Sequence, residues 1–402
     1  MANKSDITRN QWMLTGPLAK KGYDWWWHSF TAKNAETGEQ KAFYVEFFTC
    51  NPALAKKEPV IVWNDTQKQK RGVKPSYVMV NAGFWGEEKA QLHRFFPWKD
   101  VKIVYDAPFY IEADDCNCSE THTEGSITVK KYDVSNHPEW MTDEGSISWN
   151  LDIEKKIAFN VGYGAGAFFR KLNAFEMFWH AEGMKTIYSG EIVVNGVRYI
   201  VSPEDCNGYA DKNWGGDFTS PWVWLSSNNL TSAVTGKKLE NSVFNIGGGR
   251  PKVFGFALEH KLLGELYYEG TDYEFNFSKF WTGSKTEFKC EEFENEICWY
   301  VNQTTRKARL ETTITCKKSD MLLINYESPD GYKRHNRLWN GGTGVGTLKL
   351  YKYEKGEEVL VDEIIAESVG CEYGEYGMKP AVHPNPIVEE GVNEEEEEFE
   401  LV

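Results

Sequence analysis

Short segments in which every second residue is apolar recur along most of the chain. That period is the one expected of a β-strand with one buried face. A two-residue Asn195-Gly196 turn also joins segments 190–194 and 197–201, which is the strongest short signal for a β-hairpin. The other predicted strands are residues 41–48, 101–105, 126–132, 146–153, 253–258, 275–281, 296–301, 308–314 and 347–353.

Helical periodicity is scarce by comparison. Residues 87–95, where Leu92 and Phe95 share one helical face, and residues 165–169 are the two predicted helices. Many short strands separated by turn residues predict a mainly β protein made of barrels or sandwiches. The chain of 402 residues is long enough for two such domains.

The domain boundary is predicted at residues 203–207, just before an unusually polar and aromatic segment. The expected units are an N-terminal β domain over 1–204, a C-terminal β domain over 205–380 and a tail over 381–402. Eight glutamates and no basic residue fall within 389–400, so the tail is expected to be disordered and solvating. Docking of the tail to a basic partner is the alternative.

Composition narrows the function classes. Aromatic residues make up 15% of the chain, including 16 tryptophans, which favours strands and supplies side chains to line an apolar cavity. The net charge of -15 argues against non-specific binding to nucleic acid, because that requires a basic face.

The chain shows no targeting or metal-binding pattern. The polar start has no apolar signal region and no run of eighteen apolar residues follows, so we expect a cytoplasmic protein without a transmembrane segment. Peripheral contact with a membrane stays open, as does the oligomeric state. The eight cysteines have no metal-ligand spacing, and the glycine-rich segments 247–251 and 341–346 do not match a nucleotide-binding loop. We therefore predict no metal and no cofactor.

The densest mixture of polar and aromatic side chains lies in residues 208–225. Charged and amide groups are costly to bury unless they are paired or hydrogen-bonded. Their combination with several indoles predicts a partly closed pocket with a few convergent polar groups. The alternative is a turn leading into an amphipathic strand, with Asp211 and Lys212 as a solvated pair.

Two further clusters carry candidate chemistry. In residues 24–28, a strand would place Trp25 and Trp27 on one face and His28 on the other. His28 is then either a ligand-facing acid–base group or a core histidine. In residues 178–183, His180 and Glu182 share a face, which could tune a proton-transfer group or simply form a polar outer surface.

Residues 209–216 read Tyr-Ala-Asp-Lys-Asn-Trp-Gly-Gly and precede a Trp-Val-Trp strand at 222–224. This run resembles the tocopherol cyclase signature, Tyr-Ala-Glu-Lys-Asn-Trp-Gly-Gly followed by Trp-x-Trp. Carotenoid 1,2-hydratases carry a similar Trp-Asp-His-Asn-Trp-Gly segment. Residues 22–27 look like a degenerate form of the family's early Gly-Trp-Tyr strand. The likeness is good over roughly residues 175–225 and loose elsewhere.

The resemblance implies two lipocalin-like β-barrel or sandwich domains packed together, with an apolar cavity near their junction. It also implies cofactor-independent cyclisation, hydration or pericyclic chemistry on a small hydrophobic substrate. The carboxylate presumed to donate the proton in the family maps onto Asp211. Here Asp replaces the cyclase Glu, and Lys212 matches the cyclases instead of the His of the hydratases. These departures leave the substrate open.

On this hypothesis, protonated Asp211 gives its proton to an alkene, and Tyr209 or His28 takes a second proton. Neighbours on a strand face opposite sides, so Lys212 points away from Asp211 while Asn213 returns to its side. The residues expected to contact substrate are Trp25, Trp27, His180, Glu182, Lys212, Asn213, Trp214, Trp222 and Trp224. A non-catalytic lipocalin-like carrier of a hydrophobic ligand, or a purely structural β protein, is the alternative.

Overall fold

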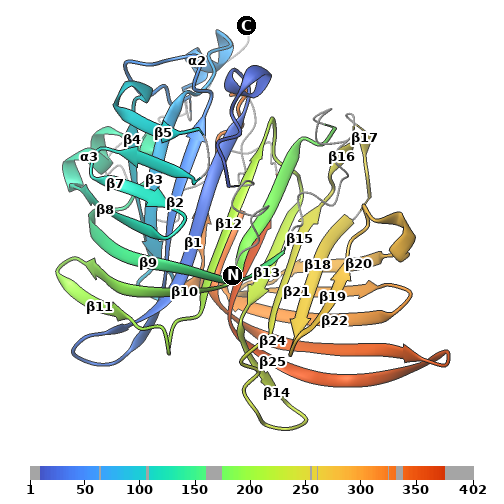
Figure 1. The fold of residues 1–402 in the computed structure, drawn as a ribbon. Helices are drawn as coiled ribbons and strands as arrows, with labels where there is room; N and C mark the ends of the chain where they lie inside the picture. The colour runs from blue at the N-terminus through green and yellow to red at the C-terminus, as the bar shows by residue number, and fades with distance from the viewer. Residues whose placement is uncertain are drawn as a thin grey trace, which may run out of the picture.

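Antiparallel strands dominate the computed structural model (Figure 1). It describes residues 10–62, 65–105, 108–159, 174–253, 256–259, 261–324, 326–331 and 338–375. The helices in these ranges are all short: η1 (Gly16–Ala19), α2 (Thr66–Lys70), η2 (Trp98–Asp100), α3 (Lys131–Asn136), η3 (Pro138–Trp140), η5 (Phe280–Thr282) and η6 (Lys318–Asp320). Within these ranges, no helix combines the length and the apolar character that a bilayer crossing requires.

The first half of the chain forms one sheet of twelve strands. Its strands are β1 (Tyr23–Asn34), β2 (Gln40–Cys50), β3 (Tyr77–Phe84), β4 (Ala90–Phe96), β5 (Val101–Val104), β6 (Tyr110–Ala113), β7 (Cys116–Ser119), β8 (His122–Val129), β9 (Gly145–Phe159), β10 (Met177–Val194), β11 (Val197–Val201) and β12 (Gly208–Gly215). Their order is β4-β3-β2-β1-β11-β10-β9-β8-β7-β6-β5, and β12 pairs with both β1 and β10. The sheet curls until β4 lies against β8 and β9, so that it closes into a barrel.

The second half forms an eleven-stranded sheet that curls into a half-barrel beside the first (Figure 1). Its strands are β13 (Trp222–Ser227), β14 (Asn229–Ser232), β15 (Val243–Gly249), β18 (Lys261–Tyr268), β19 (Thr271–Phe275), β20 (Lys285–Glu292), β21 (Glu296–Thr304), β22 (Ala308–Lys317), β23 (Leu322–Ile324), β24 (Leu338–Glu354) and β25 (Glu357–Gly374). The order is β19-β18-β15-β13-β25-β24-β22-β21-β20, with β14 on β25 and β23 on β24. A separate hairpin joins β16 (Lys252–Val253) to β17 (Phe256–Ala257).

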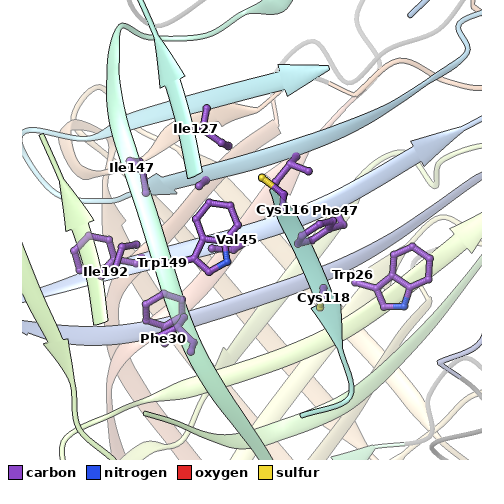
Figure 2. Packing of buried hydrophobic residues seen from close by; sticks show 14 of the residues in the cluster. Trp26, Phe30, Val45, Phe47, Cys116, Cys118, Ile127, Ile147, Trp149 and Ile192 are labelled. Atoms are coloured by element: carbon purple, nitrogen blue, oxygen red, sulfur yellow. The ribbon is translucent and has the colours of Figure 1, made fainter. Parts of the chain in front are cut away.

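Side-chain alternation divides the apolar residues into three clusters. One fills the barrel interior, where Trp26 and Phe30 of β1 meet strands from around the sheet (Figure 2). A second fills the half-barrel around Trp299. The third lies between the two sheets and takes Tyr23 and Trp27 from the other face of β1. We call this third region the interlayer. Strand β1 is therefore buried on both faces, as its run of three indoles suggests.

The mainly β architecture is confirmed, and the 190–201 hairpin is present as β10 and β11. The predicted helix over 87–95 is wrong, because these residues lead into β4, whose two faces are both covered and so obscure the strand period. The predicted strand over 275–281 is also wrong. Its start ends β19, and the Asn276 side chain accepts hydrogen bonds from the Ser278 backbone N–H and hydroxyl, which turns the chain into η5.

The structure changes two further predictions and does not describe the residues of a third. Residues 253–258 contribute only to the small β16–β17 hairpin. The predicted helix at 165–169 lies outside the described residues. The change of sheet falls between Gly215 and Trp222, later than the boundary predicted after residue 204, because β12 pairs with β1 and β10 of the barrel. Division into two domains stays a prediction.

A buried ion pair fixes the barrel-facing side of β12. Lys212 Nζ donates to Asp24 Oδ1, and both side chains are fully buried. The ammonium also lies 3.9 Å from the centroid of the Trp26 ring. Asp24 Oδ2 accepts a hydrogen bond from the backbone N–H of Met13 at 2.8 Å. Each charge is thus neutralised where solvent cannot reach it.

Lys212→Met should lower the free energy of unfolding by roughly 3–5 kcal/mol, because it leaves the buried Asp24 carboxyl without its cation, so that Asp24 must stay charged or take up a proton on folding. The double variant Asp24→Asn/Lys212→Met should recover a large part of that loss. Urea denaturation measures both. The matched control is Lys33→Met, which breaks a surface pair with Asp205 at 2.7 Å whose side chains are 42% and 49% exposed, and should cost less than about 1 kcal/mol. Equal losses in the two single variants would contradict this account.

Candidate active site

Strand β12 presents different chemistry on its two faces. All eight of its residues are buried, and it lies between β1 and β10. Lys212 faces the barrel interior, where it meets Asp24. Asp211 and Asn213 face the interlayer, where Asn213 Oδ1 accepts a hydrogen bond from Tyr23 OH at 2.7 Å. Lys212 therefore points away from Asp211 and Asn213 lies on its side, as strand alternation predicts.

Asp211 is held by one of its two carboxyl oxygens. Oδ2 accepts hydrogen bonds from Trp179 Nε1 and from Tyr209 OH, both at 2.8 Å. Tyr209 OH in turn accepts from Trp224 Nε1 at 3.2 Å, which links the barrel to the half-barrel. Oδ1 is buried and has no hydrogen-bond partner among the described residues. The carboxyl is thus fixed in orientation with one oxygen uncommitted.

Burial raises the pKa of Asp211 to about 7. The hydrogen bonds from Trp179 and Tyr209 oppose this shift because they favour the anion, while the negative charges of Glu372 and Glu182 add to it. Both donors occupy Oδ2, so the proton of the acid form belongs on Oδ1. The acid form of Asp211 is therefore populated near neutral pH, where an ordinary aspartate is ionised.

Two further buried carboxyls in the interlayer were not found by sequence reasoning. Glu46 of β2 is fully buried, and its Oε2 accepts from Tyr326 OH at 3.0 Å and from Asn81 Nδ2 at 3.3 Å. Its Oε1 has no hydrogen-bond partner in the described part of the chain. Burial raises the pKa of Glu46 to about 8. The available signal was an acid at the strand position between Tyr44 and Phe48, on an otherwise aromatic face.

The third carboxyl comes from the half-barrel. Glu372 of β25 accepts from Trp222 Nε1 and from Asn340 Nδ2, both at 2.6 Å. Asn340 Oδ1 accepts from Trp85 Nε1 at 2.8 Å, so this group also bridges the two sheets. Burial raises the pKa of Glu372 to about 7.

Strand register places Asp211 and Glu46, the two carboxyls that come from the barrel sheet, in one row across β1. Trp27 pairs with Asp211 on one side and with Glu46 on the other. Among the described residues, no lysine, arginine or histidine forms an ion pair with Asp211, Glu46 or Glu372. We call these three carboxyls and Trp27 the interlayer site.

Aromatic rings surround the interlayer site. Trp27 stacks on Tyr44 with ring centroids 4.6 Å apart, and Trp25 stacks on Tyr326 at 5.1 Å. A cavity of about 70 Å³ touches both Trp179 and Trp222, the indoles that donate to Asp211 and Glu372. Ligand pockets usually measure about 300–1,000 Å³, so a substrate must displace wall side chains to reach Asp211.

The glycine-rich segment 247–251 shapes this wall. A Cβ added at Gly247 would lie 2.6 Å from the Trp179 ring, far inside van der Waals contact. Glycine at this position lets the Trp179 indole pack closely against β15 while it donates to Asp211. Gly247 to Gly249 lie within β15, which pairs in continuous register with β13 and β18, so this part of the segment acts by close packing and not as a turn.

Several predicted site residues lie elsewhere. His28 faces the barrel interior, with Nδ1 2.9 Å from Tyr188 OH and Nε2 3.3 Å from Cys118 Sγ. Burial, with a contribution from the charge of Lys155, lowers the pKa of His28 to about 3. His28 is thus neutral and on the opposite face of the sheet from Asp211, which removes it as the acceptor of the second proton.

The pair from residues 178–183 is also on the barrel side. His180 pairs in register with Lys212, and Glu182 forms an ion pair with Lys155 at 2.9 Å. The same pleat turns Trp214 away from Asp211, where it stacks on Phe178. The predicted residues that the interlayer does bring together are Trp25, Trp27, Tyr209, Asp211, Asn213, Trp222 and Trp224.

Comparison with known proteins identifies the family of the chain. The profile of the tocopherol cyclase-like family matches residues 100–375, so the chain belongs to that family. Over 110 residues, or 27% of this chain, the sequence is 32% identical to the chloroplastic tocopherol cyclase of Zea mays. That match spans only 21% of the maize protein's length.

Three solved structures are similar over most of their length. They are an AttH protein of Nitrosomonas europaea (TM-score 0.43, 11% identity, 88% of this chain and 92% of that one), CghA (0.44, 11%, 89% and 89%) and kievitone hydratase of Nectria haematococca (0.44, 9%, 92% and 92%).

Stability should fall as pH rises through the neutral range. Folding raises the pKa of Asp211 from 3.8 to about 7, so between these values the folded state binds more protons than the unfolded state. The contribution of Asp211 to the free energy of unfolding is therefore greatest below about pH 4 and decreases as pH rises to about 7. The Asn side chain of Asp211→Asn can still accept hydrogen bonds from Trp179 and Tyr209. In this variant the free energy of unfolding should fall less between pH 4 and 7, by a few kcal/mol, since each unit of pKa shift corresponds to about 1.4 kcal/mol.

Urea denaturation at several pH values measures this slope. Glu46 and Glu372 act in the same direction, so some slope remains in the variant. The exposed control Asp205→Asn should keep the wild-type slope. A wild-type slope in Asp211→Asn would show that Asp211 ionises normally in the folded protein.

Proposed function

We propose that this member of the tocopherol cyclase-like family catalyses a cofactor-independent cyclisation, isomerisation or hydration of a small hydrophobic molecule, with Asp211 as the proton donor. The supporting observation is the geometry of its carboxyl group. One oxygen is fixed by Trp179 and Tyr209, and the other is uncommitted within an aromatic layer. An acid placed in this way is suited to protonate carbon.

The first step moves one proton. The π electrons of a substrate alkene form a C–H bond with the proton on Asp211 Oδ1, and the O–H electrons remain on the carboxylate. The Trp179 N–H and Tyr209 O–H then stabilise the anion that has formed, and they are in place before the reaction begins. Indole faces stabilise the developing carbocation, each worth about 2 kcal/mol when solvent is excluded.

The second step converts the carbocation into a neutral product. A hydroxyl oxygen of the substrate or of water forms a C–O bond and loses its proton, or a neighbouring C–H bond gives up its proton to form a new alkene. Asp211 carboxylate accepts that proton and is restored to its acid form. Tyr209, predicted above as a possible acceptor, instead donates its O–H to Asp211 Oδ2. One group therefore serves as acid and then as base, and no oxidant or reductant is consumed.

Asp211→Asn should lower turnover by about 10²–10⁴-fold, the usual contribution of a positioned acid. The assay follows product formation from a panel of prenylated phenols and polyenes by mass spectrometry, with binding followed by tryptophan fluorescence. Binding should change by less than about threefold, because the Asn side chain has the same shape. Asp205→Asn, on the surface, should turn over at the wild-type rate.

Unchanged turnover in Asp211→Asn would refute the assignment of Asp211. Binding by the wild type without any chemical change in the ligand would instead favour the carrier function. A lower melting temperature in Asp211→Asn, together with no ligand binding by the wild type, would favour a purely structural role.

A further inference from the structure

We propose that Glu46 determines substrate specificity at the interlayer site: it stays in its acid form and donates a hydrogen bond from Oε1 to an oxygen atom of the substrate. This inference rests on the proposed function, since it concerns the same substrate. The feature of the substrate that it implies is a neutral oxygen atom able to accept a hydrogen bond.

Strand register sets the spacing between Glu46 and the proposed proton donor. Trp27 pairs directly with both Asp211 and Glu46, and all three face the interlayer. Neighbouring strands lie about 4.8 Å apart, so the Cα atoms of Asp211 and Glu46 are roughly 10 Å apart. Tyr44 now covers the Trp27 ring, so a substrate must displace this side chain to lie between the two carboxyls with one end at each. A carbon protonated by Asp211 and an oxygen bound by Glu46 can belong to one small molecule.

Hydrogen bonding decides which oxygen of Glu46 carries the proton. Oε2 already accepts from Tyr326 OH and Asn81 Nδ2, whereas Oε1 has no hydrogen-bond partner among the described residues. The O–H of the acid form is therefore on Oε1. A buried donor with nothing to accept its hydrogen bond is costly, and a substrate oxygen would satisfy it.

The surroundings keep Glu46 uncharged. The titratable groups facing it are Asp211 from β12, Glu372 from β25, Tyr44 from β2, Tyr77 from β3 and Tyr326 after β23. All of them are acids, so none supplies a positive charge that would favour the Glu46 carboxylate. Desolvation therefore raises the pKa of Glu46. Among the described residues that pack around it, only the hydrogen bonds from Tyr326 and Asn81, both neutral donors, oppose this shift.

Asp211 and Glu46 then have different roles, proton transfer and substrate binding. Burial raises the pKa of both groups, so each has an acid form available near neutral pH. Asp211 is held by the Trp179 and Tyr209 donors, which stabilise the anion left after proton transfer, whereas Glu46 is assigned to binding. Trp27 Nε1 is a further buried donor without a partner in the described ranges. A site that offers several donors suits an oxygen acceptor better than an ammonium group.

The protonation state is tested first, without any ligand. Infrared spectra at pH 7 should show C=O absorption from protonated carboxyl groups, to which Asp211 and Glu372 also contribute. One component of this absorption should be absent in Glu46→Gln and present in Asp211→Asn. The exposed control Glu191→Gln should leave the spectrum unchanged. If Glu46→Gln folds and removes no such component, Glu46 is ionised and the inference is overturned.

The binding arm uses two probes with one skeleton, 2-geranyl-1,4-hydroquinone and geranylbenzene, which lacks the oxygens. Wild type should prefer the hydroquinone by about tenfold, or about 1.4 kcal/mol. Glu46→Gln keeps a donor at the same place and should keep the preference. Glu46→Leu should lose it, while its affinity for geranylbenzene changes by less than about threefold. Raising the pH above 8 should weaken the preference in wild type but not in Glu46→Gln.

The outcomes separate this inference from the proposed function. An unchanged preference in Glu46→Leu, or failure of both probes to bind, overturns the role of Glu46 and the substrate feature that it implies. Turnover that depends on Asp211 would still support the proposed function in either case. Conversely, a Glu46-dependent preference with full turnover in Asp211→Asn would uphold Glu46 and refute the assignment of Asp211.

Discussion

The arrangement of this protein depends on three carboxyl groups buried between two sheets without a positive charge to neutralise them. Taking a carboxylate out of water is expensive, and the usual compensation is an ion pair. The barrel interior uses that compensation, with Lys212 against Asp24. The interlayer does not, so Asp211, Glu46 and Glu372 respond by holding their protons. The same strand, β12, contributes to both solutions because its side chains alternate between two buried environments.

This constraint gives the interlayer its chemistry. Tyrosine, tryptophan and asparagine donors fix each carboxyl without cancelling its tendency to remain neutral. Residues from both sheets take part, since Trp224 reaches Tyr209 and Trp85 reaches Asn340. The site therefore exists only when the barrel and the half-barrel are packed together. Neutral acids surrounded by indoles are suited to protonate carbon and to stabilise the cation that results.

Much of the fold could be predicted because alternation survives in strands such as β9 and β10, and because Asn195-Gly196 marks its own hairpin. Alternation failed in β4, where both faces are covered. Within the site, Asp211 and its neighbours could be found because they are contiguous in the sequence. Glu46 and Glu372 could not, because they join Asp211 only through strand pairing and sheet packing. His28 was misplaced because the sequence does not say which face of a doubly buried strand meets the second sheet.

The central claim is that burial raises the pKa of Asp211 into the neutral range, so that its acid form is populated there. The most direct measurement is the carboxyl ¹³C chemical shift of Asp211 as a function of pH, assigned by comparison of the labelled wild type with Asp211→Asn. The account predicts a titration midpoint near pH 7. A midpoint close to the ordinary aspartate value of about 4 would contradict it.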